Sequence, residues 1–258
     1  QVEAHVCALF APRAAAPDLT ALLLAKASSR PAEQVHAPKE PPVVRLAGTS
    51  CYLPDGLVST AWMQRAALTA HDAVASVPSY RWDEVQERGT KVRFFGALLG
   101  SIQLFDHVCF GIAPLEATAM DPQQWLVLEQ GYQAFYVAGE TRASLLGSGA
   151  GVAVGVFPVG SKHGSQKQLS VYSSSSEHLS IASGRVSFVL GLHGPCTSFE
   201  TSCSSALVAC HSSARAVRYG ECRNHLAAGV NVMLLPQFSI GAAVAGMISP
   251  RGRSHTFD

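Results

Sequence analysis

Residues 198–208 have the sequence SFETSCSSALV, and this short stretch predicts the turn around which the fold is built. From Cys196 onward, Thr and Phe stand at strand-like positions, whereas the residues between Ser204 and Gly220 have apolar side chains at helical spacing. Small residues surround Cys203 where the two patterns meet, so the chain can turn sharply there. We therefore predict a strand, a tight turn at Cys203 and a helix that ends near Gly220.

A cysteine at such a turn lies at the N-terminus of the following helix. Unpaired backbone N–H groups and the positive end of the helix dipole favour the thiolate, which is the nucleophilic form of cysteine. The same N–H groups could hold an oxyanion during acyl transfer. The spacing is also typical of a small buried residue that packs a strand–helix junction. Taken by itself, the spacing leaves Cys203 with two interpretations, a nucleophile and a packing residue.

The composition indicates a well-packed globular chain, with 48% hydrophobic and 14% charged residues among 258. The net charge is +1 and no long run of Lys or Arg occurs, which argues against a nucleic-acid-binding surface. No apolar run reaches the roughly 18–20 residues of a membrane span. Seven scattered cysteines without a C-x-x-C pair predict free thiols and an intracellular setting, either the cytoplasm or a plastid-like organelle.

Residues 1–42 differ from the rest of the chain because they contain clusters of Ala and Pro. We predict a linker here; a short docking helix and the remnant of a targeting segment are the alternatives. Residues 43–258 have an α/β pattern that predicts a mostly parallel sheet with helices on both faces. Buried strands are predicted at 43–54, 149–157, 196–202 and 226–236, and helices at 59–74, 120–139, 179–191 and 204–220.

Two of the predicted helices carry more specific expectations. In the helix at 120–139, Asp121 is the predicted N-cap, Pro122 fits the first helical position, and Gln124 completes a capping-box pattern. The helix at 204–220 has the pattern of an amphipathic helix. Its predicted apolar stripe consists of Leu207, Cys210, Ala214 and Val217.

No cofactor or metal site is predicted. GVFPVGSK at 155–162 lacks the Gly-Lys-Ser/Thr order of a phosphate loop, and GSGAGV at 147–152 lacks the third glycine of a dinucleotide-binding turn. The cysteines at 196, 203 and 210 do not have zinc-site spacing. His211 lies about 12 Å from Cys203 along the predicted helix, too far for a direct hydrogen bond. The remaining candidate bases, His193, His225 and His255, are predicted to be surface or core residues.

Five stretches together resemble the β-ketoacyl synthases, the condensing enzymes of fatty-acid and polyketide synthesis. The longest is GPCTSFETSCSSALVACHSSARAVRYGEC at 194–222, which is similar to the active-site segment of that family. The others, in the family's order, are VVRLAGTSCYLPDG (43–56), VPSYRWDE (77–84), FDHVCFGIAPLEATAMDPQQWLVLEQGYQAF (105–135) and ISPRGRSHTFD (248–258). The resemblance is strongest to multidomain, modular synthases. A thiolase or a chalcone-type enzyme is a weaker match because MDPQQ and RWDE point to the ketosynthase branch.

The resemblance implies a thiolase-like fold, of which residues 43–258 would form the N-terminal half. It implies that Cys203 accepts an acyl group from the phosphopantetheine of an acyl carrier protein, and that no metal or redox cofactor takes part. It also implies a homodimer formed through the strand before Cys203. In the family, two catalytic histidines, a lysine and a glycine-rich oxyanion loop lie far downstream of the FD that ends the fifth stretch. The polypeptide to Asp258 is therefore expected to lack condensation activity.

Two departures from the family pattern stand out. Trp125 occupies a position where the family usually has Arg, and this change is expected to alter a salt bridge or a loop near the substrate entrance. Ser202 replaces the common Ala beside Cys203, which is a mild change. The alternative function is that of a catalytically incomplete homologue, which would bind an acyl carrier protein or pair with another synthase subunit.

Overall fold

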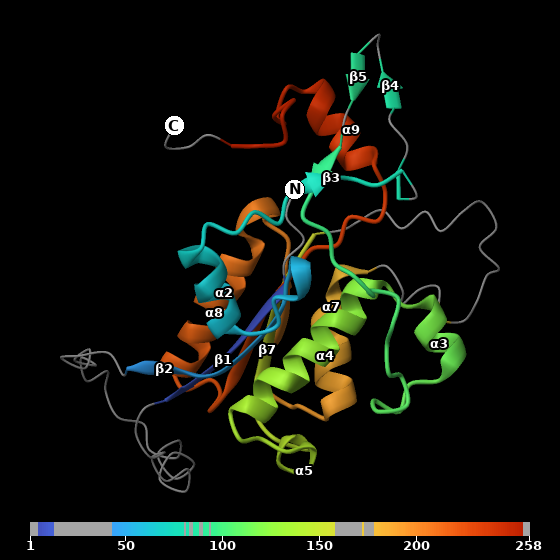
Figure 1. The fold of residues 1–258 in the computed structure, drawn as a ribbon. Coiled ribbons are helices and arrows are strands. Elements are labelled where there is room, and N and C mark those ends of the chain that lie inside the picture. The colour runs from blue at the N-terminus through green and yellow to red at the C-terminus, as the bar shows by residue number, and fades with distance from the viewer. Residues whose placement is uncertain are drawn as a thin grey trace, which may run out of the picture.

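Five strands form a mixed sheet in the order β2-β1-β9-β7-β8 (Figure 1). The computed structural model describes residues 5–12, 43–79, 81–82, 85–87, 90–92, 94–157, 172 and 178–254. β7 runs parallel to β8 and β9, and β1 runs antiparallel to β2 and β9. β2, β7, β8 and β9 therefore end at the same edge of the sheet. The strands are β1 (His5–Pro12), β2 (Val44–Tyr52), β7 (Gly151–Val156), β8 (Cys196–Phe199) and β9 (His225–Val230).

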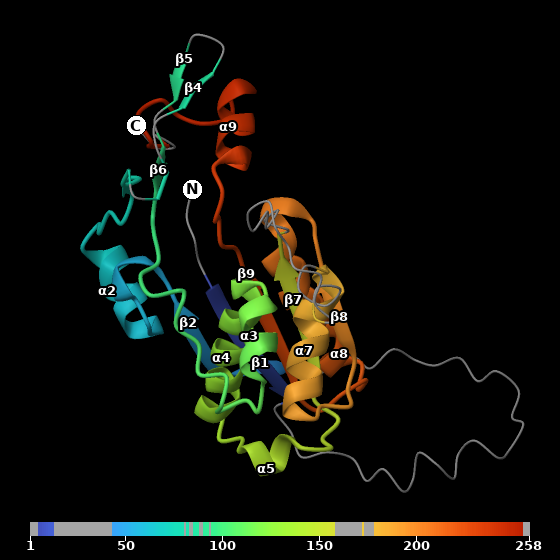
Figure 2. The same ribbon diagram turned by 90° about the vertical axis from the view of Figure 1, so that its right-hand side faces the viewer.

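Helices cover both faces of this sheet and produce three layers (Figures 1 and 2). α4 (Pro122–Val137) and α7 (Leu179–Leu190) pack on one face. α2 (Thr60–Leu68) and α8 (Ser205–Arg218) pack on the other. The largest hydrophobic core lies between the sheet and the α4–α7 layer and includes Leu128, Phe135, Val186 and Leu226. The predicted mostly parallel sheet with helices on both faces is thus confirmed.

Shorter elements surround these layers. Trp82, from the RWDE stretch, donates its indole N–H to the carbonyl of Leu234 at 3.1 Å, and its ring packs edge-on against Phe94. Through Trp82, the segment between β3 (Ala75–Ser76) and β4 (Val85–Glu87) therefore contacts the segment that follows β9. The other shorter elements are η2 (Pro54–Gly56), β5 (Thr90–Val92), β6 (Phe95–Gly96), α3 (Pro114–Ala119), α5 (Arg142–Leu145) and α9 (Gln237–Val244).

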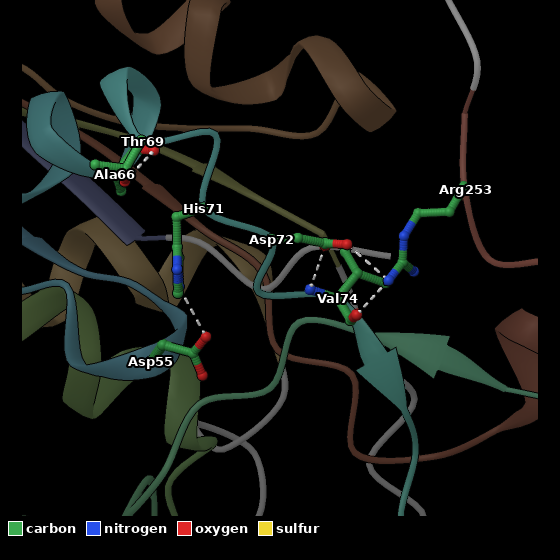
Figure 3. Close-up of polar contacts among 7 residues, drawn as sticks. All are labelled: Asp55, Ala66, Thr69, His71, Asp72, Val74 and Arg253. Carbon is green, nitrogen blue, oxygen red and sulfur yellow. Dashed lines mark hydrogen bonds and ion pairs between the residues drawn. The ribbon is translucent and has the colours of Figure 1, made fainter.

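Arg253 fastens the C-terminal stretch to the loop that follows α2 (Figure 3). Its Nη2 lies 2.7 Å from Asp72 Oδ2 and donates to the carbonyl oxygen of Val74 at 2.8 Å. The other carboxylate oxygen of Asp72 accepts from the Val74 amide. The last of the five family-like stretches therefore meets the loop after α2 through one guanidinium. A separate contact between His71 and Asp55 lies beside it.

The first turn of α4 confirms one prediction and corrects another. Asp121 is the N-cap, and its carboxylate accepts a hydrogen bond from the amide of Gln123 at 2.8 Å. The expected capping box is wrong, because the side-chain oxygen of Gln124 instead accepts from Nε of Arg185 at 2.8 Å. Arg185 is buried and also pairs with Glu116. A buried guanidinium without acceptors would be strongly destabilising, so the side chain of Gln124 bonds to Arg185 and not to the backbone of Asp121.

The expectation that residues 1–42 form a linker or targeting extension is wrong for β1. Residues His5–Pro12 are a strand that pairs with β2 on one side and β9 on the other. The Val6–Phe10 run is short and apolar, and the Ala and Pro clusters around it concealed its strand character. The rest of the 1–42 segment lies outside the described residues.

Two glycines allow α8 to lie unusually close to the sheet. Gly155 of β7 and Gly229 of β9 are direct partners in the ladder. A Cβ on Gly155 would lie 2.4 Å from the carbonyl carbon of Ser205, and one on Gly229 would lie 2.6 Å from the Cβ of Ala206. The first turn of α8 therefore packs directly on the backbone of these two glycines. We call Gly155 and Gly229 the glycine seat.

The buried face of α8 differs from the predicted stripe. Its buried residues are Ser205, Ala209, Ser213, Ala216 and Val217, whereas Leu207 is 72% exposed. Small side chains face the sheet because the glycine seat leaves room for little else. Leu207 therefore faces away from the sheet, whereas Val217, the last member of the predicted stripe, is buried as expected.

Replacing Gly155 with Ala is expected to destabilise the protein. The added Cβ would meet the backbone of Ser205 and Ala206, which cannot move independently of α8. We expect the free energy of unfolding, measured by urea titration, to fall by about 1–3 kcal/mol.

Gly184 of α7 provides the matched control, because a Cβ there would have no neighbour within 4 Å. Gly184→Ala is expected to raise the free energy of unfolding by about 0.5–1 kcal/mol, as helix propensity predicts. Unchanged stability of Gly155→Ala would contradict the close contact between α8 and the sheet.

Candidate active site

The predicted turn at Cys203 is present. β8 ends at Phe199, and a single 3-10 turn, η3 (Ser202–Ser204), leads directly into α8. Ser202 has a φ of 57°, a left-handed conformation that costs a non-glycine residue of the order of 1 kcal/mol. The adjacent Cys203 side chain is exposed. The structure thus places the cysteine on a sharply bent and strained turn at the start of a helix.

Ser205 braces this turn from inside the helix. Its hydroxyl accepts a hydrogen bond from the amide of Thr201 at 2.8 Å and lies 2.8 Å from the carbonyl oxygen of Ser202, to which it donates. The hydroxyl of Ser204 lies 2.9 Å from both oxygens of Thr201. Ser205 is buried, so its bonds are shielded from water. Sequence reasoning treated these serines only as small residues and missed their bracing role.

The packing of α8 places Cys203 above the ends of β7 and β9. Ala206 meets Gly229, and Ser213 reaches the carbonyl of Leu226, so α8 runs antiparallel to β9. Cys203 precedes Ala206 by three residues, or about 5 Å along the helix axis. A strand covers a comparable distance, about 6.6 Å, in two residues. Cys203 therefore lies at the level of the strand positions that follow the glycine seat by two.

Those strand positions are Phe157 and Asn231. Both residues lie one position beyond the end of their strand. Val232 belongs to the same core as Leu226, Ala228 and Val230, so the alternation of β9 continues and places Asn231 on the face of Gly229, which α8 covers. The ring of Phe157 packs edge-on against Phe238 of α9 with centroids 5.3 Å apart. The side-chain oxygen of Asn231 is buried and accepts no hydrogen bond in the part of the chain that the structure describes. Neither residue was recognised from the sequence, although the alternation of the strand pattern was sufficient to find Asn231.

The other described cysteines differ from Cys203 in burial or in position. Cys51, Cys109, Cys196, Cys203, Cys210 and Cys222 are all free thiols, as predicted. Burial raises the pKa of the Cys51 and Cys210 thiols, and it raises the pKa of Cys222 to about 11. These three thiols are therefore poorer nucleophiles at neutral pH. Cys109 and Cys196 are exposed but do not lie at the start of a helix.

Among the described residues, no histidine is hydrogen-bonded to Cys203, whose sulfur has a contact with the hydroxyl of Ser202. His225 is the first residue of β9 and is buried beside Gly151, at the sheet edge opposite the Cys203 turn. His211 is exposed on α8, His193 is exposed in the loop before β8, and His255 lies outside the described residues. Within the described ranges, no three His, Cys, Asp or Glu side chains are grouped as metal ligands, and no helix is long and apolar enough to cross a membrane.

Trp125 has a packing role in place of the usual arginine. Its ring stacks on Phe105 with centroids 5.6 Å apart and planes 6° apart, and Phe105 stacks in turn on Phe110. The edge of Phe110 meets Tyr132. The indole N–H of Trp125 is buried without a partner among the described residues. Trp125 thus belongs to a stack of aromatic rings on α4 and the segment before α3.

Comparison with known proteins shows the family to which the chain belongs. The model of the β-ketoacyl synthase N-terminal domain matches residues 42–258. The chain belongs to the β-ketoacyl synthase family. The chain is 36% identical over 225 residues to a mycocerosic acid synthase-like polyketide synthase of Mycolicibacterium smegmatis, an alignment that covers 83% of the chain and 11% of that protein. It is 37% identical over 230 residues to the phthioceranic/hydroxyphthioceranic acid synthase of Mycobacterium tuberculosis, with the same two coverages.

Solved ketosynthases have the same fold. A ketosynthase from module 6 of the bacillaene synthase of Bacillus subtilis superposes with a TM-score of 0.62 at 30% identity, covering 75% of this chain and 32% of that one. The oxazolomycin ketosynthase domain OzmH KS7 of Streptomyces albus gives 0.67 at 29% identity, covering 79% and 38%. The fold is therefore the N-terminal half of the thiolase-like condensing-enzyme fold, as expected. The chain spans about a tenth of the length of the curated relatives and about a third of the solved ketosynthases.

The burial of His225 predicts a loss of stability in acid. Burial lowers the pKa of His225, so the folded protein binds this proton less readily than the unfolded chain, whose imidazole titrates near about 6.5. The contribution of neutral His225 is present above that pH and is lost as the pH falls toward the lower folded pKa. The loss is at most about 1.4 kcal/mol for each pH unit.

Urea unfolding at several pH values between about 7.5 and 5 tests this prediction. His225→Gln is expected to show a shallower decline in the free energy of unfolding than the unmodified protein. Parallel declines would show that His225 does not carry the acid sensitivity.

Proposed function

We propose that Cys203 is the acyl-accepting nucleophile of a polyketide-type ketosynthase. The observation that carries this proposal is its place on the strained turn between β8 and α8, within the stretch that resembles the family's active-site segment. Cys203 is exposed, so an incoming thioester can reach it. The braced turn and the glycine seat hold it in one position without help from a flexible loop.

In the first step, the Cys203 thiolate attacks the carbonyl carbon of an acyl thioester. A new C–S bond forms, the carbonyl oxygen becomes an oxyanion, and N–H groups of the first turn of α8 stabilise its charge. The tetrahedral intermediate collapses with cleavage of the original C–S bond, and the departing thiolate takes up a proton. The acyl group is then held on Cys203 as a thioester.

In the second step, a malonyl-type thioester loses carbon dioxide. The electron pair of the broken C–C bond becomes an enolate, which attacks the carbonyl carbon of the acyl-cysteine. A C–C bond forms, the Cys203 sulfur leaves as a thiolate, and the product is a β-ketoacyl thioester. General acid–base groups contribute about 10²–10⁴-fold to such steps, and the family resemblance assigns them to histidines downstream of Asp258.

We propose an acyl carrier protein as the donor of both thioesters. Its phosphopantetheine arm presents the acyl group on a sulfur, which is the leaving group that the first step requires. The chemistry uses no metal or redox cofactor, since every bond change is an acyl transfer or a decarboxylation.

Covalent labelling tests the nucleophile. Incubation with an acyl-N-acetylcysteamine thioester is expected to add one acyl group at Cys203, detected by intact-protein and peptide mass spectrometry. Cys203→Ala should remove this adduct.

Cys109→Ala is the matched control, because Cys109 is also an exposed free thiol in the described structure. The control should label as the unmodified protein does. Equal labelling of Cys203→Ala and the unmodified protein would reject Cys203 as the acyl acceptor.

We also propose a homodimer that forms through β8. This strand lies at one end of the sheet order and pairs only with β7 among the described strands. The amide of Val152 donates to the carbonyl of Pro195 at 2.7 Å, so in the alternating ladder the amide of Cys196 points away from β7. Such an unpaired edge is a template for pairing with a second strand.

Cys196→Pro tests the dimer, because proline removes the outward N–H and leaves the bonds to β7 in place. Light scattering after size-exclusion chromatography is expected to show a dimer for the unmodified protein and for Cys196→Ala. It should show a monomer for Cys196→Pro. A dimer that survives Cys196→Pro would place the interface elsewhere.

A catalytically incomplete homologue is the second candidate. The observation that favours it is that no histidine among the described residues is hydrogen-bonded to Cys203. Such a protein would bind an acyl carrier protein or pair with another synthase subunit. It would retain these interactions after Cys203→Ala and would form no carbon–carbon bond from a malonyl-type thioester.

A further inference from the structure

We propose that Gln123 is a positioning residue for Cys203. This proposal rests on the proposed role of Cys203 as nucleophile. Gln123 is the second residue of α4 and approaches the sheet from the face opposite α8. It is 2% exposed. Its contacts are to the ends of the two strands that carry the glycine seat.

The side-chain amide of Gln123 bridges β7 and β9 where their own pairing stops. The last pair in the ladder is Val156 with Val230. Beyond it, Nε2 of Gln123 donates to the carbonyl oxygen of Phe157 at 3.1 Å, and Oε1 accepts from the amide of Val232 at 3.1 Å. One side-chain amide thus takes the place of a peptide group between two strands that are separating. We call this arrangement the strand-end clamp.

The strand-end clamp acts on the two side chains at the level of Cys203. It holds the carbonyl of Phe157 itself and the amide directly after Asn231. The alternation that continues from Val230 to Val232 places the side chain of Asn231 on the α8 face. The two bonds of Gln123 hold the backbone at Phe157 and Asn231 in place. They therefore hold the part of the sheet over which the turn with Cys203 lies.

The buried oxygen of Asn231 supports this role. An unpaired buried acceptor costs about 1–3 kcal/mol, so a freely moving strand end would turn it toward water. The oxygen remains buried and without a donor in the described part of the chain. The bond from Val232 to Gln123 opposes that rotation at the next residue.

Gln124 offers a matched comparison. It is adjacent in the same turn of α4 and is 3% exposed, but its oxygen accepts from Arg185 on α7. Removing either amide leaves buried partners unsatisfied and lowers stability. Only the removal of Gln123 disturbs the strand ends below Cys203.

The test compares Gln123→Leu, Gln124→Leu and Gln123→Glu in the full-length protein. Acylation of Cys203 is followed over a range of acyl-N-acetylcysteamine concentrations, which separates the maximal rate from the half-saturating concentration. Urea unfolding of each variant measures the loss of stability separately. We expect Gln123→Leu to lower the maximal rate by about tenfold, with little change in half-saturation, because a displaced nucleophile reacts slowly once the thioester is bound.

Gln124→Leu should lose stability while its maximal rate stays within about twofold of the unmodified protein. Gln123→Glu retains an acceptor for the Val232 amide and should give an intermediate rate; it also serves if Gln123→Leu does not fold. An unchanged maximal rate in the Gln123 variants, or an equal loss in Gln124→Leu, would overturn the positioning role. Adduct formation on Cys203→Ala would instead overturn the proposed nucleophile, whatever the Gln123 variants show.

Discussion

The candidate active site depends on the close contact between α8 and the sheet, which is possible only because Gly155 and Gly229 have no side chains. Gly155 and Gly229 are ladder partners, and their missing Cβ atoms let the first turn of α8 rest on the sheet backbone. A helix held this closely cannot shift along the sheet without colliding with the neighbouring strand residues. The left-handed backbone of Ser202 is sustained by this rigid support, because strained residues persist only where their surroundings fix them. Cys203 takes its position from the seat below it and the serine brace beside it.

Features that depend on nearby residues were predicted well from the sequence. The β7, β8 and β9 strands, the α2, α4, α7 and α8 helices and the turn at Cys203 follow from local patterns of apolar and small residues. The shorter helices α3, α5 and α9 were not predicted. The cap at Asp121 was also correct, since it involves an amide only two residues away. Residues 248–258 were matched to the family by their motif, and Arg253 within them joins the loop after α2.

Features that depend on distant partners were missed or misassigned. Gln124 was expected to cap its own helix, but its partner Arg185 lies 61 residues away. The role of Gln123 depends on Val232, 109 residues away, and no local pattern indicates that pairing. The buried face of α8 was predicted from hydrophobicity, whereas the glycine seat selects small side chains for that face. β1 was taken for part of a linker because only its pairing with β2 and β9 distinguishes it as a strand.

The exposure of Cys203 bears on the fate of the acyl group as well as on its arrival. A thioester on an exposed sulfur is in contact with bulk water, and the nearby Leu207 is exposed too. Hydrolysis then competes with carbon–carbon bond formation for the same carbonyl carbon. In the proposed reaction, the turn would position Cys203 for acylation, but it would not by itself determine how long the acyl-cysteine survives. The yield of a condensation at this cysteine would be governed by whatever surface excludes water from the outer face of α8.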